Sequence, residues 1–409
     1  GGMVPVLLRK HFVANEWQTT VASSALAVMA ILAVFWNELY QRISTRRYLL
    51  LFWVFSVLPL GGIAFCNSPN TVLAFVIFSA AGMGGLNPLS GDILRSCYPP
   101  SARSRAWSLI KSLEQFTIVI SVFGVGIWFD RDPHAYRIYF ALAVVVVSIG
   151  VLLLGRITRQ PLFRERLRTA STASIAWSLR DAYVNMSRVL REDRRFRQYE
   201  TAFCVYGLGW MICYAMVPFV QVDVLRLKYG EAFTATQVTF QLTMMLCFVP
   251  MGYVLDRAGP IRASSWAFGW LVLYPILLMT ATGPLTLTLA SVVYGLGMAA
   301  VNLAWTLGPV TLARNPADAP QYLAIHATLV SVRAILGQFP AVAIYWYTGS
   351  IYLPLLMGGA MFLVGAVMMR RLDLETRVTP PAPVVLAPVS EEPVGGAGGA
   401  ATASAATDE

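Results

Sequence analysis

A few charged residues interrupt the apolar stretches of this sequence, and their side chains are the ones that could do chemistry inside a membrane. Lys111 and Glu114 stand three residues apart in one apolar stretch, and His326 and Arg333 stand seven apart in another. A charge inside a membrane span is costly and faces the interior of a helix bundle or a water-filled cavity. We therefore expect these four residues to bind a solute or to carry a proton.

The two stretches leave different alternatives open. Lys111 and Glu114 share one helix face, so they either neutralise each other or present a titratable acid beside a cation for an anionic solute group. Arg333 has no acid in its own stretch. It must find a carboxylate or a carbonyl on a neighbour, extend to the membrane surface or meet a substrate. His326 has an unperturbed pKa near neutral pH, so it is a proton carrier or merely a hydrogen-bonded side chain.

Several other kinds of chemistry are not indicated by the sequence. The five cysteines and three histidines are scattered, so we expect no metal site. A phosphate-binding Gly-x-x-x-x-Gly-Lys-Ser/Thr loop is missing, which argues against ATP as the energy source, and no cofactor is expected. A membrane-embedded enzyme would gather His, Asp or Cys side chains at one depth. The sequence shows no such constellation, and we expect a protein that is not an enzyme.

The composition identifies the medium in which the chain folds. Apolar residues make up 57% of the 409 residues and charged residues 13%, and the mean hydropathy is +0.61. Soluble domains carry about 25% charged residues. Continuous apolar runs of about 20 residues, without alternation of period two, are typical of helices that cross a bilayer. The sequence therefore predicts an all-α integral membrane protein.

The apolar runs define the expected membrane spans. Eleven complete spans are predicted, at residues 17–39, 48–65, 71–94, 106–129, 136–154, 201–222, 234–255, 263–280, 284–313, 321–347 and 351–369. The run before the first of these is too short to cross a bilayer and is expected to form a stub. Residues 1–157 would form a first helical half, 158–199 a cytoplasmic linker, 200–372 a second half and 373–409 a disordered tail.

The linker between the halves carries an amphipathic pattern. Apolar residues recur at helical spacing from Ile175 to Leu190, and Arg180, Arg188 and Arg191 occupy the opposite face. Such a basic helix either lies on the anionic cytoplasmic leaflet or ties the two halves together, and the two interpretations are compatible.

The distribution of lysine and arginine predicts the orientation. Most of the 31 basic residues fall in the linker and in alternate connections between spans, which places these segments and the C-terminus in the cytoplasm. The same bias accounts for the net charge of +10, so no nucleic-acid partner is needed to explain it. We expect a multi-pass protein of the cytoplasmic (inner) membrane whose environment is the lipid bilayer.

A charged segment between two spans of the second half carries the most specific motif. It reads Gly252-x-x-x-Asp256-Arg257-x-Gly259-x-x-Arg262. This segment resembles the cytoplasmic loop of the major facilitator superfamily (MFS) of transporters, between the second and third helices of a six-helix half. The resemblance implies a gate in which these residues hold the two halves together in one state and release them in the other.

A second charged segment stands in the first half, where Arg42 precedes Arg257 by 215 residues. Here Gln41 replaces the motif's aspartate, so this copy of the gate is expected to be altered. Arg42 or Arg46 could pair instead with Asp92, at the cytoplasmic end of the fourth helix.

The offset of 215 residues recurs along the chain. Residues 82–87, which end in Asn87, return as residues 297–302, which end in Asn302, and Lys111 maps onto His326. A shared register through successive helices indicates two parallel six-helix repeats, as in the MFS fold. By this resemblance the two asparagines line the cavity and bind substrate, although helix–helix contacts would explain their symmetry equally well.

The repeat also predicts that the first helix is mostly missing. Met3-Val4-Pro5 corresponds to Met216-Val217-Pro218, which lies well inside the seventh helix of the family pattern. The chain is therefore interpreted as an N-terminally truncated member with eleven full transmembrane helices and a stub.

The function implied is secondary active transport of a small organic solute by alternating access, by a monomer. Proton coupling is preferred, through Glu114 or His326. An uncoupled facilitator and a drug exporter remain alternatives within the fold, although residues 122–126 lack the proline of the family's drug–proton motif. The alternatives from other classes are a transport-inactive membrane sensor and a membrane-embedded enzyme.

Overall fold

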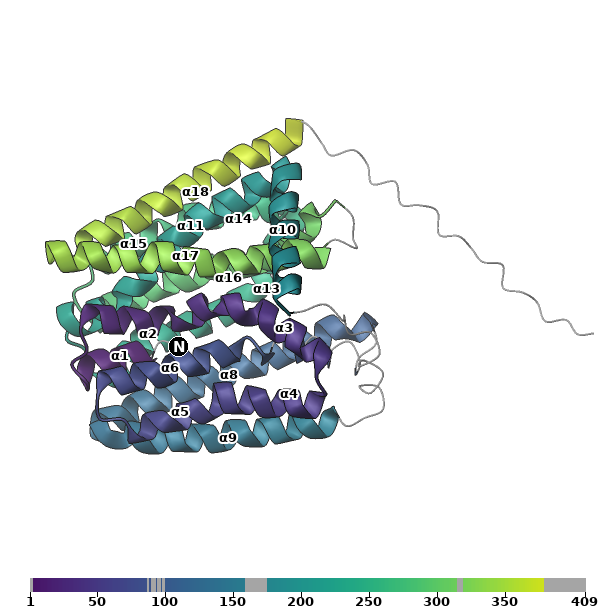
Figure 1. Ribbon diagram of the computed structural model, residues 1–409. Coiled ribbons are helices and arrows are strands. Elements are labelled where there is room, and N and C mark those ends of the chain that lie inside the picture. The colour runs from purple at the N-terminus through teal and green to yellow at the C-terminus, as the bar shows by residue number, and fades with distance from the viewer. Residues whose placement is uncertain are drawn as a thin grey trace, which may run out of the picture.

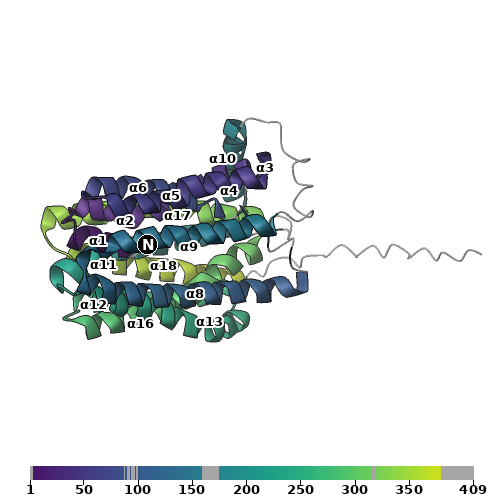
Figure 2. The same cartoon turned by 90° about the horizontal axis from the view of Figure 1, so that it is seen from below.

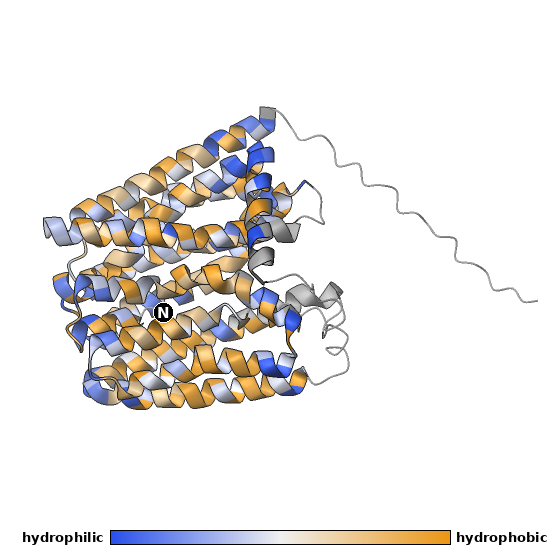
Figure 3. Ribbon diagram, in the orientation of Figure 1, coloured by the Kyte–Doolittle hydropathy of each residue, from blue (hydrophilic) through white to orange (hydrophobic). Residues whose placement is uncertain are grey.

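The computed structural model describes residues 3–86, 88–89, 93, 97, 100–158, 175–314 and 319–378. Every secondary-structure element in these ranges is a helix. Long helices run side by side, and α10 (Ile175–Glu192) crosses them at one end, which we call the linker end (Figure 1). Hydrophobic residues lie along the long helices, whereas hydrophilic residues gather at the helix ends and on α10 (Figure 3).

The first half consists of helices in which several spans are built from contiguous pieces. These are α1 (Met3–Lys10), α2 (Glu16–Met29), η1 (Ala30–Leu32), α3 (Ala33–Arg42), α4 (Thr45–Phe52), η2 (Trp53–Val57), α5 (Leu58–Gly62), η3 (Ile63–Phe65), α6 (Pro69–Met83), α8 (Pro100–Arg131), η4 (Pro133–Ala135) and α9 (Tyr136–Ile157).

The second half is described almost without interruption. Its helices are α11 (Arg194–Phe219), η7 (Val220–Val224), α12 (Tyr229–Phe233), η8 (Thr234–Val238), α13 (Thr239–Ala258), α14 (Pro260–Leu271), α15 (Leu273–Met279), α16 (Pro284–Leu312), α17 (Ala319–Thr348) and α18 (Tyr352–Val378).

The helices match the predicted spans closely. Nine helical stretches within the described residues are long and apolar enough to cross a membrane, and each coincides with a predicted span. Of the other two predictions, 17–39 is covered by α2, η1 and α3, and the first part of 71–94 overlaps α6, a shorter apolar helix of 15 residues. The predicted N-terminal stub is the short helix α1.

Two helices of the second half extend past the residues predicted for it. α18 continues to Val378 rather than ending at residue 372, because Asp373 is buried and binds Arg370 and Arg377 within the last turns. α11 begins at Arg194, inside the segment assigned to the linker, because Asp193 caps its first turn. Residues 379–409 lie outside the described ranges.

The two halves lie on opposite sides of the bundle in Figure 1, with purple and blue helices below and green and yellow helices above. α2 of the first half packs on α17 of the second, and α8 packs on α12 and α13 (Figure 2). Within the second half, α11 and α18 approach closely at Gly209, where an added Cβ would lie 2.6 Å from the carbonyl oxygen of Gly358. Small residues permit such close helix packing in membranes.

The linker helix α10 contacts both α3 and α11, so it bridges the halves. On its apolar face, Met186, Val189 and Leu190 pack around a cluster formed by Phe196, Tyr322 and Ile325 at the starts of α11 and α17. The amphipathic helix predicted from the sequence therefore packs, at this end, against the protein itself.

Candidate functional site

α11 and α17 face each other across a seam of polar side chains inside the second half. Nδ1 of His326 on α17 lies 2.8 Å from Oε1 and 2.9 Å from Oε2 of Glu200 on α11. His326 is 0% exposed and Glu200 3%. Because an ionised carboxylate can only accept, the imidazole Nδ1–H donates when Glu200 is charged. Removing either partner would leave a buried polar group uncompensated, which is strongly destabilising.

Arg333 lies next to this pair in the same seam. Its Nη1 donates to the carbonyl oxygen of Phe203 at 3.0 Å, and its Nε donates to that of Leu329 at 3.3 Å. The side chain is 2% exposed, and its Nη2 is buried without a hydrogen-bond partner. Arg333 stands 14 residues from Ala319 and 15 from Thr348, so this guanidinium belongs to the middle of α17.

Helical spacing explains why these side chains meet. Glu200, Phe203 and Gly207 share one face of α11, and His326 and Arg333, seven residues apart, share one face of α17. Gly207 makes room for the arginine, because a Cβ there would lie 2.3 Å from the Cδ of Arg333.

Glu200 is the functional candidate that the sequence analysis missed. The residue was placed at the very start of the second half, one position before the predicted span. The signal that would have found it is Asp193, whose Oδ1 accepts from the backbone N–H of Phe196 at 2.9 Å and so starts α11 at Arg194. Because α11 begins at Arg194, Glu200 lies in the second turn of the helix. Tyr322 donates to Oδ2 of the same Asp193 at 2.8 Å, which ties α17 to that cap.

Aromatic rings enclose the imidazole of His326. Phe203 and Trp305 approach it in edge-to-face geometry, with centroid distances of 4.8 and 5.2 Å. Tyr199 lies 6.2 Å away and donates its hydroxyl proton to the carbonyl oxygen of Ala304 on α16. These rings shield the Glu200–His326 pair from water, which strengthens its electrostatic interaction.

Unpaired polar atoms are concentrated on α17. Among the described residues, nine buried side-chain nitrogen or oxygen atoms have no hydrogen-bond partner, and four of them belong to this helix: His326 Nε2, Ser331 Oγ, Arg333 Nη2 and Gln338 Oε1. A buried polar group without a partner costs about 1–3 kcal/mol. α17 is therefore the helix where a solute or water would gain most by supplying partners.

Of the other predicted solute-binding residues, the two whose side chains the structure describes, Glu114 and Asn302, are not part of this seam. Glu114 is exposed on α8, and the side chain of Lys111 and all of Asn87 lie outside the described structure. Asn302 on α16 is exposed and donates to the carbonyl oxygen of Met298, one turn earlier on its own helix, at 2.8 Å. The structure thus brings His326 and Arg333 together and leaves Glu114 and Asn302 elsewhere.

The loop motif of the second half forms the turn between α13 and α14. Gly259 has φ +77° and ψ 160°, a backbone conformation that favours glycine, and it ends α13 and begins α14. Asp256 and Arg257 are exposed beside it, and the guanidinium of Arg262 lies 4.8 Å from the ring centroid of Trp266. An added Cβ at Gly252 would meet nothing within 4 Å.

In the first-half copy of the motif, the structure describes an ion pair within one helix. Arg42 binds Glu38 on its own helix, with Nε 2.8 Å from Oε1. Arg46 is exposed at the start of α4. Asp92, the predicted partner, lies outside the described residues.

At the end of the bundle opposite the linker, polar contacts join the two halves. Arg9 of α1 binds Asp223 of η7, with Nη2 2.8 Å from Oδ2, and Lys10 donates to the carbonyl oxygen of Leu227 at 2.6 Å. Asp130 of α8 accepts from the backbone N–H groups of Tyr229 and Gly230 at 2.6 and 2.8 Å. We call these three contacts the far-end latch. No local sequence pattern pairs these residues, because they lie about 100 to 217 positions apart.

A pair of histidines lies beside the far-end latch. The rings of His11 and His134 meet edge to face at 5.1 Å, against Phe12 and Tyr136. Burial lowers the pKa of His11, and the positive charges of His134 and Arg137 lower it further.

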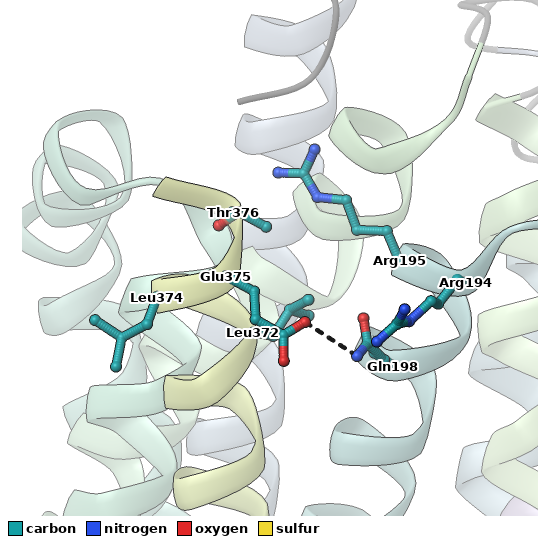
Figure 4. Close-up of a pocket in the computed structure, with 7 residues that line it drawn as sticks. All are labelled: Arg194, Arg195, Gln198, Leu372, Leu374, Glu375 and Thr376. Carbon is teal, nitrogen blue, oxygen red and sulfur yellow. Dashed lines mark hydrogen bonds between the residues drawn. The ribbon is translucent and has the colours of Figure 1, made fainter. Parts of the chain in front are cut away.

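A pocket of about 660 Å³ opens at the linker end, between α11 and α18. Its polar lining includes Arg194, Arg195 and Gln198 of α11 and Glu375 of α18, and Gln198 donates to Glu375 at 3.2 Å (Figure 4). None of the residues that line it belongs to the Glu200–His326–Arg333 seam.

Comparison with known proteins identifies the fold. The family model of the Major Facilitator Superfamily matches residues 1–338. No curated protein matches the sequence significantly. The nucleoside transporter NupG has a similar structure, with TM-score 0.67, 12% identity and coverage of 92% of this chain and 93% of its own.

Two further solved structures show the same fold. A POT family transporter in complex with a thioalcohol-conjugated peptide gives TM-score 0.68 at 14% identity, over 92% of this chain and 93% of its own. The human organic anion transporter MFSD10 (TETRAN) gives 0.60 at 17% identity, over 90% and 88%. The all-α membrane fold predicted from the sequence is thereby confirmed, and the chain is a transporter rather than an enzyme. It belongs to the Major Facilitator Superfamily.

Proposed function

We propose that this protein moves a small organic solute across the cytoplasmic membrane by alternating access and couples the movement to protons at Glu200 and His326. The solute would bind between the two halves, beside α11 and α17, which both contact α2 of the first half. Rocking of the halves would expose it to each side in turn. The linker end would face the cytoplasm, in line with the basic residues of α10.

The observation that carries the proposal is the buried contact between Glu200 and His326. A carboxylate and an imidazole at 2.8 Å are close enough to share a proton, and both side chains are titratable. Buried ionisable groups in membrane spans are typical of proton pathways. Because α11 and α17 belong to the same half, the pair would stay together while the other half moves.

The coupling acid proposed here is Glu200 rather than Glu114. Glu200 is buried beside a titratable partner, whereas Glu114 is exposed on α8. Glu114 keeps the competing role that the sequence suggested, and a direct comparison of the two acids decides between them.

The similar structures guide the choice of solutes. Their titles name a nucleoside transporter, an organic anion transporter, and POT family transporters bound to a peptide conjugate or to 5-aminolevulinic acid. At 12–17% identity these proteins share the fold alone, so they supply compounds to test and not a substrate.

The motif around Gly259 is proposed as the gate at the linker end. Asp256 is exposed and available to pair with the other half when that end closes. A partly exposed ion pair contributes about 1 kcal/mol or less. Replacing Asp256 with Asn should therefore slow transport without abolishing it.

The test is uptake by the purified protein in sealed lipid vesicles under an imposed pH gradient. Vesicles are offered uridine, a dipeptide, 5-aminolevulinate and an aromatic carboxylate, each labelled. The unmodified protein should accumulate at least one of them against its gradient, and collapsing the pH gradient should stop accumulation. Uptake that only equilibrates, at a rate independent of pH, would favour the uncoupled facilitator.

Glu200→Gln should abolish accumulation while leaving exchange of labelled for unlabelled solute intact, because Gln cannot release a proton. Glu192→Gln, at the exposed end of α10, is the matched control and should accumulate normally. Loss of accumulation in Glu114→Gln but not in Glu200→Gln would move the coupling site to α8.

A further inference from the structure

We infer that Arg333 binds an anionic group of the transported solute, so that the substrate class is a small organic anion, a carboxylate or a phosphate. The inference rests on the proposed transport function and adds the chemical class of the substrate. It starts from a buried guanidinium near the middle of α17 that uses two of its nitrogens on carbonyl oxygens and leaves Nη2 without a partner.

The position of the guanidinium is fixed from two sides. The bond from Nε to the carbonyl oxygen of Leu329 shows that the side chain runs back toward the start of α17, as helical side chains do. The bond from Nη1 to the carbonyl oxygen of Phe203 places it three residues beyond Glu200 on α11. Both helices therefore put the guanidinium about one turn from the Glu200–His326 pair.

A carboxylate or phosphate is the partner that this geometry favours. The guanidinium is planar and always charged, and it forms paired hydrogen bonds with carboxylate and phosphate oxygens. Its present acceptors are neutral carbonyl groups, which do not balance its charge. Exchange of one of these carbonyl contacts for an anionic oxygen would give both Nη1 and Nη2 a strong acceptor.

The charges in the seam link the anion to the proton. With His326 neutral, the charges of Glu200 and Arg333 cancel, and a bound monoanion would leave the seam at one net negative charge. With His326 protonated, the same anion brings the seam to neutrality. Anion binding should therefore favour protonation of His326, and protonation should favour anion binding to the same degree.

The surroundings of His326 support this charge count. Glu200 and Tyr199 face it from α11, Arg333 stands on its own helix, and Trp305 of α16 does not titrate. The other helices packed on α17 are α2, η1 and α18, together with α10 at the start of α17. Their described charged residues include Glu16 at the start of α2, residues 370–377 at the end of α18, and Arg188, Arg191 and Glu192 near the end of α10, whereas η1 carries no charge. The charges on α2 and α18 lie at helix ends, and α10 crosses the bundle at the linker end (Figure 1).

The experiment measures binding to the detergent-purified full chain by calorimetry. Matched pairs of probes differ in one anionic group: benzoate and benzamide, 5-aminolevulinate and its methyl ester, uridine monophosphate and uridine. At least one probe with the anionic group should bind, with at least tenfold higher affinity than the partner that lacks it. Its affinity should rise as the pH falls from 8 to 6. Repeating the titration in two buffers of different ionisation enthalpy should show uptake of about one proton per anion bound.

Arg333→Gln should weaken binding of that anion at least tenfold, and Arg333→Lys, which keeps the positive charge, should restore part of it. Arg137→Gln, on the first half, is the control and should bind as the unmodified protein does. If Arg333→Gln does not fold, the proton count and the Arg333→Lys affinity still decide the question. Equal affinity for charged and neutral partners, no anion binding, or anion binding without proton uptake would each overturn the inference.

The two proposals fail in different ways. If vesicles accumulate only neutral solutes under a pH gradient, the anion site is wrong and proton-coupled transport stands. If no solute accumulates under a pH gradient, proton-coupled transport is wrong, whatever the calorimetry shows.

Discussion

Arg333 crosses from α17 to α11 only because residue 207 is a glycine. The absent side chain leaves the space through which the guanidinium reaches the carbonyl oxygen of Phe203. Gly207 therefore shapes the proposed anion site although it has no side chain. A substitution of Gly207 changes the position of the Arg333 guanidinium without changing its charge.

Gly207→Ala should displace the guanidinium while leaving its charge in place. The added Cβ would lie 2.3 Å from the Cδ of Arg333, so the arginine must leave the Phe203 carbonyl. We expect a loss of about 1–3 kcal/mol of stability from overpacking, seen as a lower melting temperature, and weaker anion binding. Gly124→Ala is the matched control, because a Cβ there meets nothing within 4 Å. Equal melting temperatures for the two variants would contradict this account.

At the scale of single residues, the sequence identified two of the three members of the seam. His326 and Arg333 stand out because each is a polar residue in an apolar stretch. Glu200 does not, because six basic or acidic residues precede it between positions 191 and 197 and conceal where the helix begins. The pairing itself depends on the packing of α11 against α17, which no local pattern reveals.

The turn between α13 and α14 requires a glycine at position 259 of the loop motif. The φ and ψ of Gly259 lie in a region that residues with a Cβ avoid. The first half has Ser44 at the corresponding place, with φ −61° and ψ 143°, an ordinary extended conformation. The two copies of the motif therefore form different turns, which agrees with the altered sequence of the first.

Gly259→Ala should weaken the second-half turn specifically. An alanine held at that φ and ψ costs about 1–3 kcal/mol, so the loop should become more accessible to limited proteolysis after Arg257 or Arg262. Gly252→Ala, seven residues earlier in the same motif, meets nothing within 4 Å and should be cleaved at the original rate. Identical cleavage of both variants would show that the turn adapts to alanine.

The histidine pair beside α1 predicts a dependence of stability on pH. The pKa of His11 is lowered in the folded state, so the unfolded chain takes up a proton more readily below the ordinary histidine pKa of about 6.5. The contribution of this group is fully present above that pH and is lost as the pH falls below it. The melting temperature should drop between pH 7.5 and 5.5, and the drop should be smaller in His11→Gln. An equal drop in both proteins would rule out His11 as the cause.

At the scale of the whole molecule, the far-end latch joins the two halves at one end of the bundle. It joins α1 to η7 and α8 to α12, so that end cannot separate without breaking the contacts of Arg9, Lys10 and Asp130. In the proposed alternating-access mechanism, rocking of the halves must break them once in every cycle. The strength of the latch should therefore set how the protein divides its time between the two states.

Asp130→Asn should loosen the far-end latch. The amide oxygen can still accept a hydrogen bond, but the charge that strengthens the bonds from Tyr229 and Gly230 is lost. Hydrogen exchange at these two backbone amides should become about tenfold faster. Asp132→Asn is the control, because Asp132 accepts a hydrogen bond from the backbone N–H of His134 within the same half. It should leave the exchange rates at residues 229 and 230 unchanged. Slower or unchanged exchange in Asp130→Asn would show that the charge of Asp130 does not stabilise the far-end latch.

At this scale the sequence predicted most of the helices but few of the contacts that hold the two halves together. Apolar runs give the spans, because each helix satisfies its own backbone and needs only an apolar exterior. The latch instead depends on contacts such as that of Arg9 with Asp223, 214 residues away. Such pairs become visible only when the two halves are placed against each other.

The docking of α10 has a consequence for the way the protein is made. Its apolar face packs on Phe196, Tyr322 and Ile325, and the last two are synthesised long after Leu190 leaves the ribosome. Until α17 has been inserted, the basic linker has no complete docking site and its apolar face is left without these partners. We expect that face to rest on the lipid surface during biogenesis and to move to the protein when the second half is nearly complete. The two interpretations of the amphipathic linker would then describe successive stages in the life of one chain.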